Sequence, residues 1–324
     1  MLNQNPVRAA LWMGCAVLSF SFMAVAAREL LRHMGAFEIL FLRTMVTMLL
    51  VLAAIARQGP ATLRTRLLRL HLARALMHLG GQYCWIYAIG ALTLATVFAI
   101  EFTMPVWVAV LATLFLGERM NRGRVTMLVL GLAGIAIILR PAIGDEQAAG
   151  GLHPAALVML LGSMFYAGNM IMTKRISAAD SPLAVLFWMS LTQLPITFVS
   201  ALPQWVMPQP SDLVWAVVIG TGSFIAHYSM TRAMKLGDAT LVVPIDFLRL
   251  PLIAVVGALL YAERFDPMVF VGAAVIFAGT YYSLSREARR AAGPASATVS
   301  DRRAGAAACG PPAPEPRADR ARRG

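Results

Sequence analysis

Ten long apolar segments follow one another through residues 10–284, and they constrain the fold more than any other feature of this sequence. A bilayer core about 30 Å thick requires roughly 20 mostly apolar residues per helix, and a backbone in lipid must form its hydrogen bonds internally, which favours helices. Only 14% of the residues are charged, whereas about a quarter are charged in a soluble domain. The sequence therefore predicts an all-α integral membrane protein, a ten-helix bundle. The predicted spans are Ala10–Ala27, Ala36–Ala56, Leu70–Ile89, Leu94–Leu116, Val125–Leu139, Pro154–Thr173, Pro182–Leu202, Leu213–Thr231, Thr240–Tyr261 and Pro267–Leu284.

Positively charged residues lie mainly in alternate loops between these segments. With the amino terminus placed inside, the inner loops carry twelve Lys and Arg residues, and the outer loops carry four, which are Arg28, Arg32, Arg140 and Arg264. Cytoplasmic loops of membrane proteins are enriched in Lys and Arg. The sequence therefore predicts a multi-pass protein of the inner (plasma) membrane with both termini in the cytoplasm.

The two ends of the chain need separate interpretation. Arg8, the apolar run after it and Ala24-Val25-Ala26 resemble a secretory signal peptide, but the internal repeat described below requires this segment as the first helix. Residues 286–324 are rich in Ala, Arg, Pro and Gly, which predicts a disordered basic cytoplasmic tail that could also attract anionic lipid headgroups. Nine of the 28 Lys and Arg residues follow Leu284, so the net charge of +12 does not indicate a nucleic-acid partner.

An internal repeat with an offset of 145 residues organises the ten segments. The offset aligns Glu118-Arg119 with Glu263-Arg264, Glu101-Phe102 with Asp246-Phe247, Tyr83 with Tyr228, Ala88 with Ala233, and Gly134 with Gly279. The first two segments of each half match poorly. Because each half has five segments, an odd number, the halves must cross the membrane in opposite directions. We therefore expect two inverted five-helix modules, 1–140 and 154–285, joined by a periplasmic loop at 141–153. Inverted repeats are typical of many secondary transporters, whose substrate site lies at the repeat interface.

Part of each half resembles a known family. Residues 103–141, TMPVWVAVLATLFLGERMNRGRVTMLVLGLAGIAIILRP, are similar to the end of the EamA module of the drug/metabolite transporter superfamily, where a proline-containing helix precedes a Gly-Glu-Arg turn and a Gly-rich helix. The turn here is Gly117-Glu118-Arg119, and the second copy has Ala262 in place of the Gly. The resemblance covers residues 10–284. It implies a permease whose cavity is lined by spans one, three, four, six, eight and nine, and whose substrate is an exported amino acid, drug or metabolite, or an imported vitamin or nucleoside-like compound.

Four charged side chains lie within the predicted spans and away from their ends: Arg43, Glu101, Asp246 and Arg249. A charge at the bilayer centre costs roughly 2.5–3.5 kcal/mol on insertion scales, so such residues usually face the bundle interior or water. Asp246 and Arg249 are three residues apart and can neutralise each other. Glu101 has Met104 at the equivalent position, so it must find Arg43, a histidine or a proton elsewhere. We expect all four in a substrate or proton pathway, with Glu101 the better proton carrier; a purely structural ion pair or carboxylate is the alternative.

Polar and aromatic residues at helical spacing extend this candidate site. They are His78, Gln82 and Trp85 on the third span, His227 on the eighth, Tyr166 and Asn169 on the sixth, and Ser19 and Phe22 on the first. Residues three, four or seven apart share a face of a helix, and the offset of 145 aligns His227 with Gln82. We expect these side chains to contact the substrate or protons, although packing alone also explains such a stripe.

Prolines and glycines mark special backbone positions. Pro105, Pro244 and Pro251 interrupt the helices that carry the acids, and transporters use such breaks near their sites; tolerance of proline in a packed bundle is the alternative. Four glycines predict close helix packing: Gly131, Gly134, Gly272 and Gly279.

Motifs for nucleotide, metal or serine-nucleophile chemistry do not occur in the sequence, so we expect no enzyme, no cofactor and no metal. The expected partners are the lipid bilayer and a small-molecule substrate, together with protons if the acids titrate. We expect a monomer or a homodimer. The leading interpretation is a secondary transporter that moves a small polar or amphipathic metabolite by alternating access, as an exporter of amino acids or related compounds. Uptake of a vitamin or nucleoside-like metabolite is one alternative. A membrane-embedded enzyme or lipid-handling protein with Glu101 and Asp246 as acid and base is another.

Overall fold

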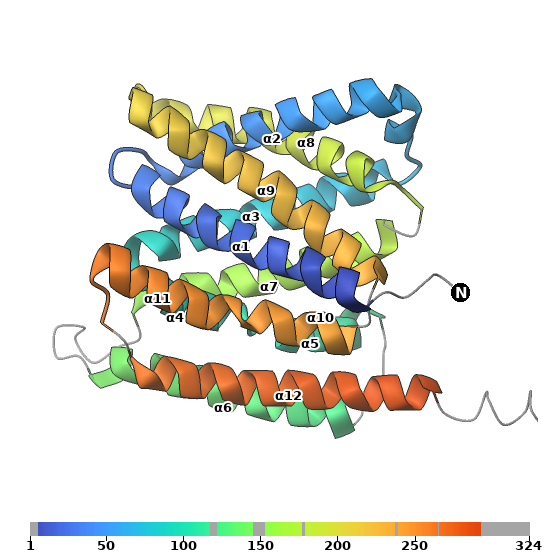
Figure 1. The fold of residues 1–324 in the computed structure, drawn as a ribbon, viewed down its shortest axis with the longest axis vertical. Helices are drawn as coiled ribbons and strands as arrows, with labels where there is room; N and C mark the ends of the chain where they lie inside the picture. The colour runs from blue at the N-terminus through green and yellow to red at the C-terminus, as the bar shows by residue number, and fades with distance from the viewer. Residues whose placement is uncertain are drawn as a thin grey trace, which may run out of the picture. The chain divides into compact units, whose positions relative to one another are not determined.

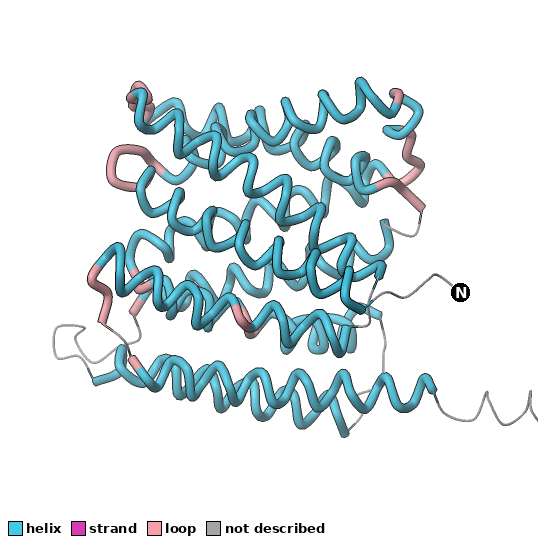
Figure 2. Tube along the Cα trace, in the orientation of Figure 1, coloured by secondary structure: helices cyan, strands magenta, loops and turns pink. Residues whose placement is uncertain are grey.

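The computed structural model describes residues 6–116, 122–144, 153–176, 179–236, 239–264 and 266–292. Within these ranges the chain forms twelve α-helices and two short 3-10 helices, η1 (Pro60–Leu63) and η3 (Leu202–Gln204), with no strand (Figures 1 and 2). The all-α fold class is confirmed. The α-helices are α1 (Pro6–Leu30), α2 (Ala36–Gln58), α3 (Leu68–Ala91), α4 (Leu94–Glu101), α5 (Met104–Leu116), α6 (Arg122–Gly144), α7 (Pro154–Ile176), α8 (Pro182–Ala201), α9 (Pro210–Leu236), α10 (Ala239–Phe247), α11 (Arg249–Tyr261) and α12 (Pro267–Ala292).

Nine helical segments of the described chain are long and apolar enough to cross a membrane. They correspond to nine of the ten predicted spans, and α4 and α5 together make one of them, Leu94–Leu114. The third predicted span, α3, is 24 residues long but less apolar. One face of α3 carries His71, Arg74, His78 and Gln82, all of them buried. These interior polar residues lower the hydropathy of α3 without removing it from the bundle, where it packs along α7.

The bounds of the helices reproduce the 145-residue repeat. α5 and α11 begin 145 residues apart, at Met104 and Arg249, and the helices before them end at Glu101 and Phe247, within one residue of the same offset. The second helices of the two halves, whose sequences match poorly, begin at Ala36 and Pro182, one residue from the same register. The repeat therefore extends beyond the segments in which sequence identity reveals it.

Helices of the two repeats pack against each other in exchanged pairs. α1 lies along α9, while α3, the counterpart of α9, lies along α7, the counterpart of α1. α2 packs against its own counterpart α8, and α6 runs beside its counterpart α12 (Figure 1). This exchange is what a pseudo-two-fold axis between inverted repeats requires.

The crossing of α6 and α12 depends on glycine. A Cβ atom added to Gly134 would lie 2.6 Å from the carbonyl oxygen of Gly272, and one added to Gly272 would lie 2.7 Å from the carbonyl oxygen of Gly134. Both distances are shorter than a carbon–oxygen contact allows. The predicted close packing at these two glycines is confirmed.

Two predicted boundaries differ from the structure. α6 continues to Gly144, into the predicted loop 141–153, and α12 continues to Ala292, into the predicted tail 286–324. The residues that extend α12, 285–292, are mostly Ala, Arg and Glu, which favour helix, so this helix continues after its apolar segment ends. The Gly-Glu-Arg turn at 117–119, residues 145–152 of the predicted loop, and the tail from residue 293 lie outside the described residues.

Candidate functional site

The fourth and ninth predicted spans break at equivalent positions. Residues 102–103 separate α4 from α5, and Leu248 separates α10 from α11. Pro105 and Pro251 stand in the first turns of α5 and α11. Because proline has no N–H, the carbonyl groups four residues earlier, those of Glu101 and Phe247, lose their helical partners. The two breaks therefore lie directly beside the two acidic residues of the spans.

Pro244, in contrast, does not interrupt its helix. α10 runs from Ala239 to Phe247 with Pro244 inside it. Pro244 is the sixth of the nine residues of this helix, and its missing N–H leaves only the carbonyl group four residues earlier, that of Thr240, without a helical partner. The prediction that Pro244 breaks the helix is wrong.

Beside the breaks, Arg249 lies between the two carboxylates. Arg249 Nη2 donates to Glu101 Oε1 at 3.2 Å, and Arg249 Nε lies 3.6 Å from Asp246 Oδ1. The side chain of Arg249 is 5% exposed, while Glu101 and Asp246 keep 17% and 21% exposure. The prediction that Glu101 must find Arg43, a histidine or a proton is wrong, because Arg249 reaches across the repeat interface from α11 to the end of α4.

Aromatic rings enclose the guanidinium group of Arg249. Its Cζ atom lies 4.8 Å from the ring centroids of Phe20 and Phe98, and 5.2 Å from that of Phe102. Cations are attracted to aromatic faces within about 6 Å. Phe102 also stacks on Phe247, its counterpart at the offset of 145, with centroids 4.1 Å apart. Phe20 and Phe98 cannot be recognised as site residues in the sequence, because an aromatic residue in an apolar span does not reveal which way it faces.

A second polar cluster surrounds Arg43 of α2, which is 1% exposed. Arg43 Nη1 donates to Ser223 Oγ at 3.1 Å, and Nη2 donates to Gln193 Oε1 at 3.3 Å. The amide nitrogen of Gln193 lies 3.1 Å from His78 Nδ1. Among the described residues no salt bridge joins Arg43 to a carboxylate, and its guanidinium group donates to a hydroxyl and an amide oxygen instead. Gln193 was missed from the sequence, where its only signal is an amide within an apolar span.

Histidine and tyrosine side chains connect the two clusters. The rings of His78 and His227 are 5.5 Å apart, and Phe20, which contacts Arg249, lies 5.7 Å from His227. Gln82 Nε2 donates to the hydroxyl oxygen of Tyr166 at 2.9 Å, and the Tyr166 ring is 6.2 Å from His78. Helices α1, α3, α7 and α9 thus contribute polar or aromatic groups to one interior region.

The remaining predicted residues divide into interior and exterior positions. Trp85 is 4% exposed and packs on Phe98, and Ser19 is 9% exposed. Asn169 is half-buried, and its side-chain oxygen has no hydrogen-bond partner among the described residues. Phe22 is 61% exposed. The prediction that Phe22 shares the site with Ser19 is wrong, because the rotation of α1 turns Phe20 inward and Phe22 outward.

The comparisons with known proteins agree with this architecture. The EamA-like transporter family model matches residues 7–140 and 153–285. The chain belongs to the EamA-like transporter family. The family model matches the chain twice, once in each half, and these two repeats fit the predicted inverted-repeat helical bundle.

Several curated relatives of this transporter have named substrates. The S-adenosylmethionine uptake transporter of Rickettsia bellii is 24% identical over 85% of this chain and 93% of the relative. The riboflavin transporter of Rhizobium johnstonii is 28% identical over 91% and 97%, and the pseudopaline exporter CntI of Pseudomonas aeruginosa is 26% identical over 81% and 90%. These names favour transport over catalysis. A solved structure entitled "Crystal structure of protein" shares the fold, with a TM-score of 0.62 and 20% identity over 87% of this chain and 98% of that one.

At the predicted outer end of the transporter, Arg28 ties α1 to two other elements. It donates to the Leu92 carbonyl oxygen at 2.7 Å and to Glu263 Oε1 at 2.6 Å. Glu263 also accepts the N–H of Leu94, the first residue of α4, at 2.9 Å. Burial raises the pKa of Glu263, and this effect outweighs the lowering by the Leu94 N–H and by Arg28. One carboxyl group therefore holds α1, α4 and the segment after α11 together.

At the predicted inner end, a different set of contacts joins α3 to the segment before α8. Thr65 Oγ1 donates to Asp180 Oδ2 at 2.5 Å, and His71 Nε2 lies 2.7 Å from the same oxygen. Burial raises the pKa of Asp180, but the hydrogen bonds from Thr65 and His71 together lower it by more, so the pKa lies below its usual value. Asp180 is consequently ionised at neutral pH, so this transporter is bridged at both ends by charged groups.

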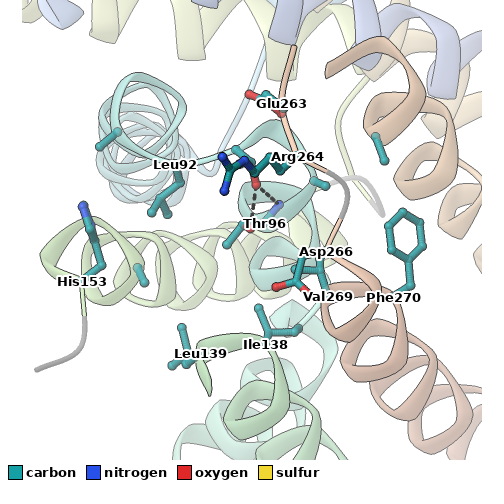
Figure 3. Close-up of a pocket in the computed structure, with 15 residues that line it drawn as sticks. Leu92, Thr96, Ile138, Leu139, His153, Glu263, Arg264, Asp266, Val269 and Phe270 are labelled. Atoms are coloured by element: carbon teal, nitrogen blue, oxygen red, sulfur yellow. Dashed lines mark hydrogen bonds between the residues drawn. The ribbon is translucent and has the colours of Figure 1, made fainter. Parts of the chain in front are cut away.

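A cavity of about 530 Å³ adjoins the Arg28 and Glu263 contacts of the transporter. Figure 3 shows Ile138 and Leu139 on one side of it and Arg264 and Glu263 across from them. None of the residues predicted for the site line this cavity. It is a space at the end of the bundle, and the central clusters are distinct from it. Within the described residues, no group of three or more His, Cys, Asp or Glu side chains is arranged to hold a metal ion.

Proposed function

We propose that this EamA-family transporter carries a small polar or amphipathic metabolite across the inner membrane by alternating access, and that the substrate binds between the Arg249 and Arg43 clusters. The supporting observation is the interior location of both clusters at the interface of two inverted repeats. Groups of both signs lie there beside aromatic rings, which suits a substrate with charged and flat parts. The contacts at the two ends join different helices, so one set can open while the other stays closed.

For the substrate, we place uptake of a nucleoside-like or vitamin metabolite first. The names of the S-adenosylmethionine and riboflavin relatives support it, and both named compounds contain a flat heteroaromatic ring. Export of an amino acid or related compound, the leading interpretation from sequence, is the second candidate. The pseudopaline exporter among the relatives supports that direction.

The test is transport by purified protein in liposomes. Radiolabelled S-adenosylmethionine, riboflavin and a mixture of amino acids are supplied to vesicles preloaded with the same unlabelled compound. We expect exchange of S-adenosylmethionine or riboflavin without chemical change, and none in protein-free vesicles. Exchange of amino acids alone would favour the export candidate, and a chemically altered product would contradict transport and support a membrane enzyme.

Proton coupling through Glu101 or Asp246 is part of the same proposal. Both carboxylates lie at helix breaks between the repeats and keep partial exposure, so proton exchange with either side requires only a small opening. The liposome assay measures it directly: an imposed pH gradient should drive net accumulation of the substrate. Exchange that is insensitive to the gradient would assign the carboxylates to substrate binding alone.

We also propose that both termini face the cytoplasm. The excess of Lys and Arg in the alternate loops of the sequence supports this orientation. A cysteine introduced at Gln209, in a variant without the native cysteines, should react with a membrane-impermeant maleimide on intact cells. A cysteine at Arg64 should react only after lysis, and the reverse pattern would invert the topology.

A further inference from the structure

We infer that Phe20, Phe98, Phe102, Glu101 and Asp246 form a receptor for a substrate cation, and that Arg249 occupies this receptor as an internal substitute when the substrate is absent. The inference rests on the transport function proposed above. It adds the chemical class of the ligand, an organic cation such as a sulfonium, ammonium or guanidinium group.

The geometry around Arg249 is that of a cation site. Three aromatic rings lie 4.8, 4.8 and 5.2 Å from its Cζ atom. They come from α1, α4 and the break after α4, so the cation lies where three chain segments meet. Rings around a desolvated cation attract it through their negative faces, and such aromatic cages also recognise ligand cations. Two carboxylates complete the enclosure.

Arg249 is held less firmly than a structural arginine. A buried arginine commonly binds a carboxylate through two parallel hydrogen bonds at about 2.7–2.9 Å. Arg249 instead makes one hydrogen bond at 3.2 Å to Glu101, and its Nε atom has no hydrogen-bond partner among the described residues. Arg28, at the outer end, makes contacts of 2.6 and 2.7 Å. The weaker attachment lets Arg249 leave its position at a small loss of hydrogen bonding.

The charges around the receptor favour an exchange of cations. When Glu101 and Asp246 are both ionised, they carry two formal negative charges against the one positive charge of Arg249, and the region then still attracts a cation while Arg249 is present. The carboxylates keep 17% and 21% exposure, whereas Arg249 fills the enclosed part at 5%. An arriving cation can therefore contact the carboxylates first and then replace Arg249 between the rings. After release, the return of Arg249 restores the starting charge balance.

The first experiment compares two ligands that differ in charge at one atom. S-adenosylmethionine carries a methyl group that makes its sulfur a sulfonium cation, and S-adenosylhomocysteine lacks this group and the charge. Equilibrium binding to the wild-type protein should favour the cation about tenfold. Equal affinities would overturn the inference.

The second experiment measures how replacing Arg249 changes the affinity for S-adenosylmethionine. Replacing an arginine that binds the ligand weakens binding, whereas replacing one that competes with the ligand strengthens it. Arg249→Met introduces the residue found at the equivalent position, Met104. If Arg249 competes with the ligand, this variant should bind S-adenosylmethionine more tightly than the wild type, by about tenfold. If Arg249 instead holds an anionic group of the ligand, the variant should bind it more weakly, which would overturn the inference.

A third experiment does not depend on recognition of the adenosyl group. In Arg249→Ala, ethylguanidinium should raise the melting temperature because it refills the cage, while the neutral N-ethylurea should not. Adding Phe20→Leu should weaken this rescue several-fold, and Phe22→Leu, two residues away on α1 but 61% exposed, should leave it unchanged. Equal effects of the cation and the neutral analogue would overturn the inference. Loss of Arg249 leaves Glu101 and Asp246 without their cation, and Arg249→Ala is not used if this prevents folding. In that case the wild type and Phe20→Leu are compared for the ratio of their affinities for S-adenosylmethionine and S-adenosylhomocysteine. The preference for S-adenosylmethionine should be lower in Phe20→Leu than in the wild type.

The outcomes separate the inference from the proposed function. Rescue by ethylguanidinium without transport of any tested compound by the wild type would leave the cation receptor in place and contradict the proposed substrates. Transport of S-adenosylmethionine and its neutral analogue at equal rates and affinities would support the function and contradict the receptor.

Discussion

The broken helix α4–α5 and its counterpart α10–α11 have the same architecture but different charges. Each has an acid followed directly by a phenylalanine at the break, and a proline in the first turn after it. The first residue after the break is Met104 in one repeat and Arg249 in the other. One arginine consequently serves both acids, with a hydrogen bond at 3.2 Å to Glu101 of the opposite repeat and a 3.6 Å approach to Asp246 of its own. The backbone symmetry of the repeats is retained, while the charge asymmetry makes a single residue responsible for both carboxylates.

Neutralising each acid in turn tests this asymmetry and should give the largest effect. Glu101→Gln removes a charge-assisted hydrogen bond worth about 1.5–3 kcal/mol, which corresponds to roughly ten- to hundredfold in substrate affinity if the site depends on it. Asp246→Asn removes a 3.6 Å ion pair that has no hydrogen bond, so a smaller loss, of about two- to fivefold, is expected. The measurement is the substrate concentration at half-maximal exchange in liposomes.

The control for this pair of variants is folding. Both proteins should insert into the membrane and elute from a sizing column as the wild type does, since neither substitution changes side-chain size. Equal losses in the two variants would show that Arg249 serves the two acids equally. Full activity of Glu101→Gln would remove Glu101 from the mechanism.

The prolines of the two breaks provide a second, smaller test. Pro105→Ala and Pro251→Ala supply the N–H that the carbonyls of Glu101 and Phe247 lack, and each should stabilise the folded protein by about 1 kcal/mol while slowing exchange. The effect on exchange should be greater for Pro105→Ala, because the carbonyl concerned belongs to Glu101. Thermal unfolding in detergent and initial exchange rates measure the two quantities. Pro244→Ala, within a continuous helix, is the matched control, and a change as large as that of Pro105→Ala would show that the breaks have no special role.

Much of the architecture could be predicted from the order of residues. Apolar length predicts the spans because lipid excludes unsatisfied backbone, and an odd number of spans per repeat requires inversion. The offset of 145 places Glu101 and Asp246 at equivalent positions, and the starts of α5 and α11 carry the same offset. The weak match of the first two segments did not reveal that α2 and α8 follow the register within one residue, because backbone geometry persists after side chains diverge.

The grouping of several polar side chains follows from the sequence. Helical spacing predicts that His78, Gln82, Tyr166 and His227 face the interior, and the structure brings them together. Spacing along one helix cannot give its rotation about its own axis, so it does not show that Phe20 and not Phe22 faces Arg249. Gln193 was missed because its partners, Arg43 and His78, are on other helices.

By itself, the sequence determined the helical membrane bundle, the inverted repeat and the matched positions of the two acids, because these depend on hydropathy, length and periodicity along the chain. Only the tertiary structure decided that Arg249 bonds to Glu101, that Phe20, Phe98 and Phe102 surround it, and that different contacts bridge the two ends. Those facts depend on the rotation and crossing of helices that are far apart in sequence, and the packing of the whole bundle sets both.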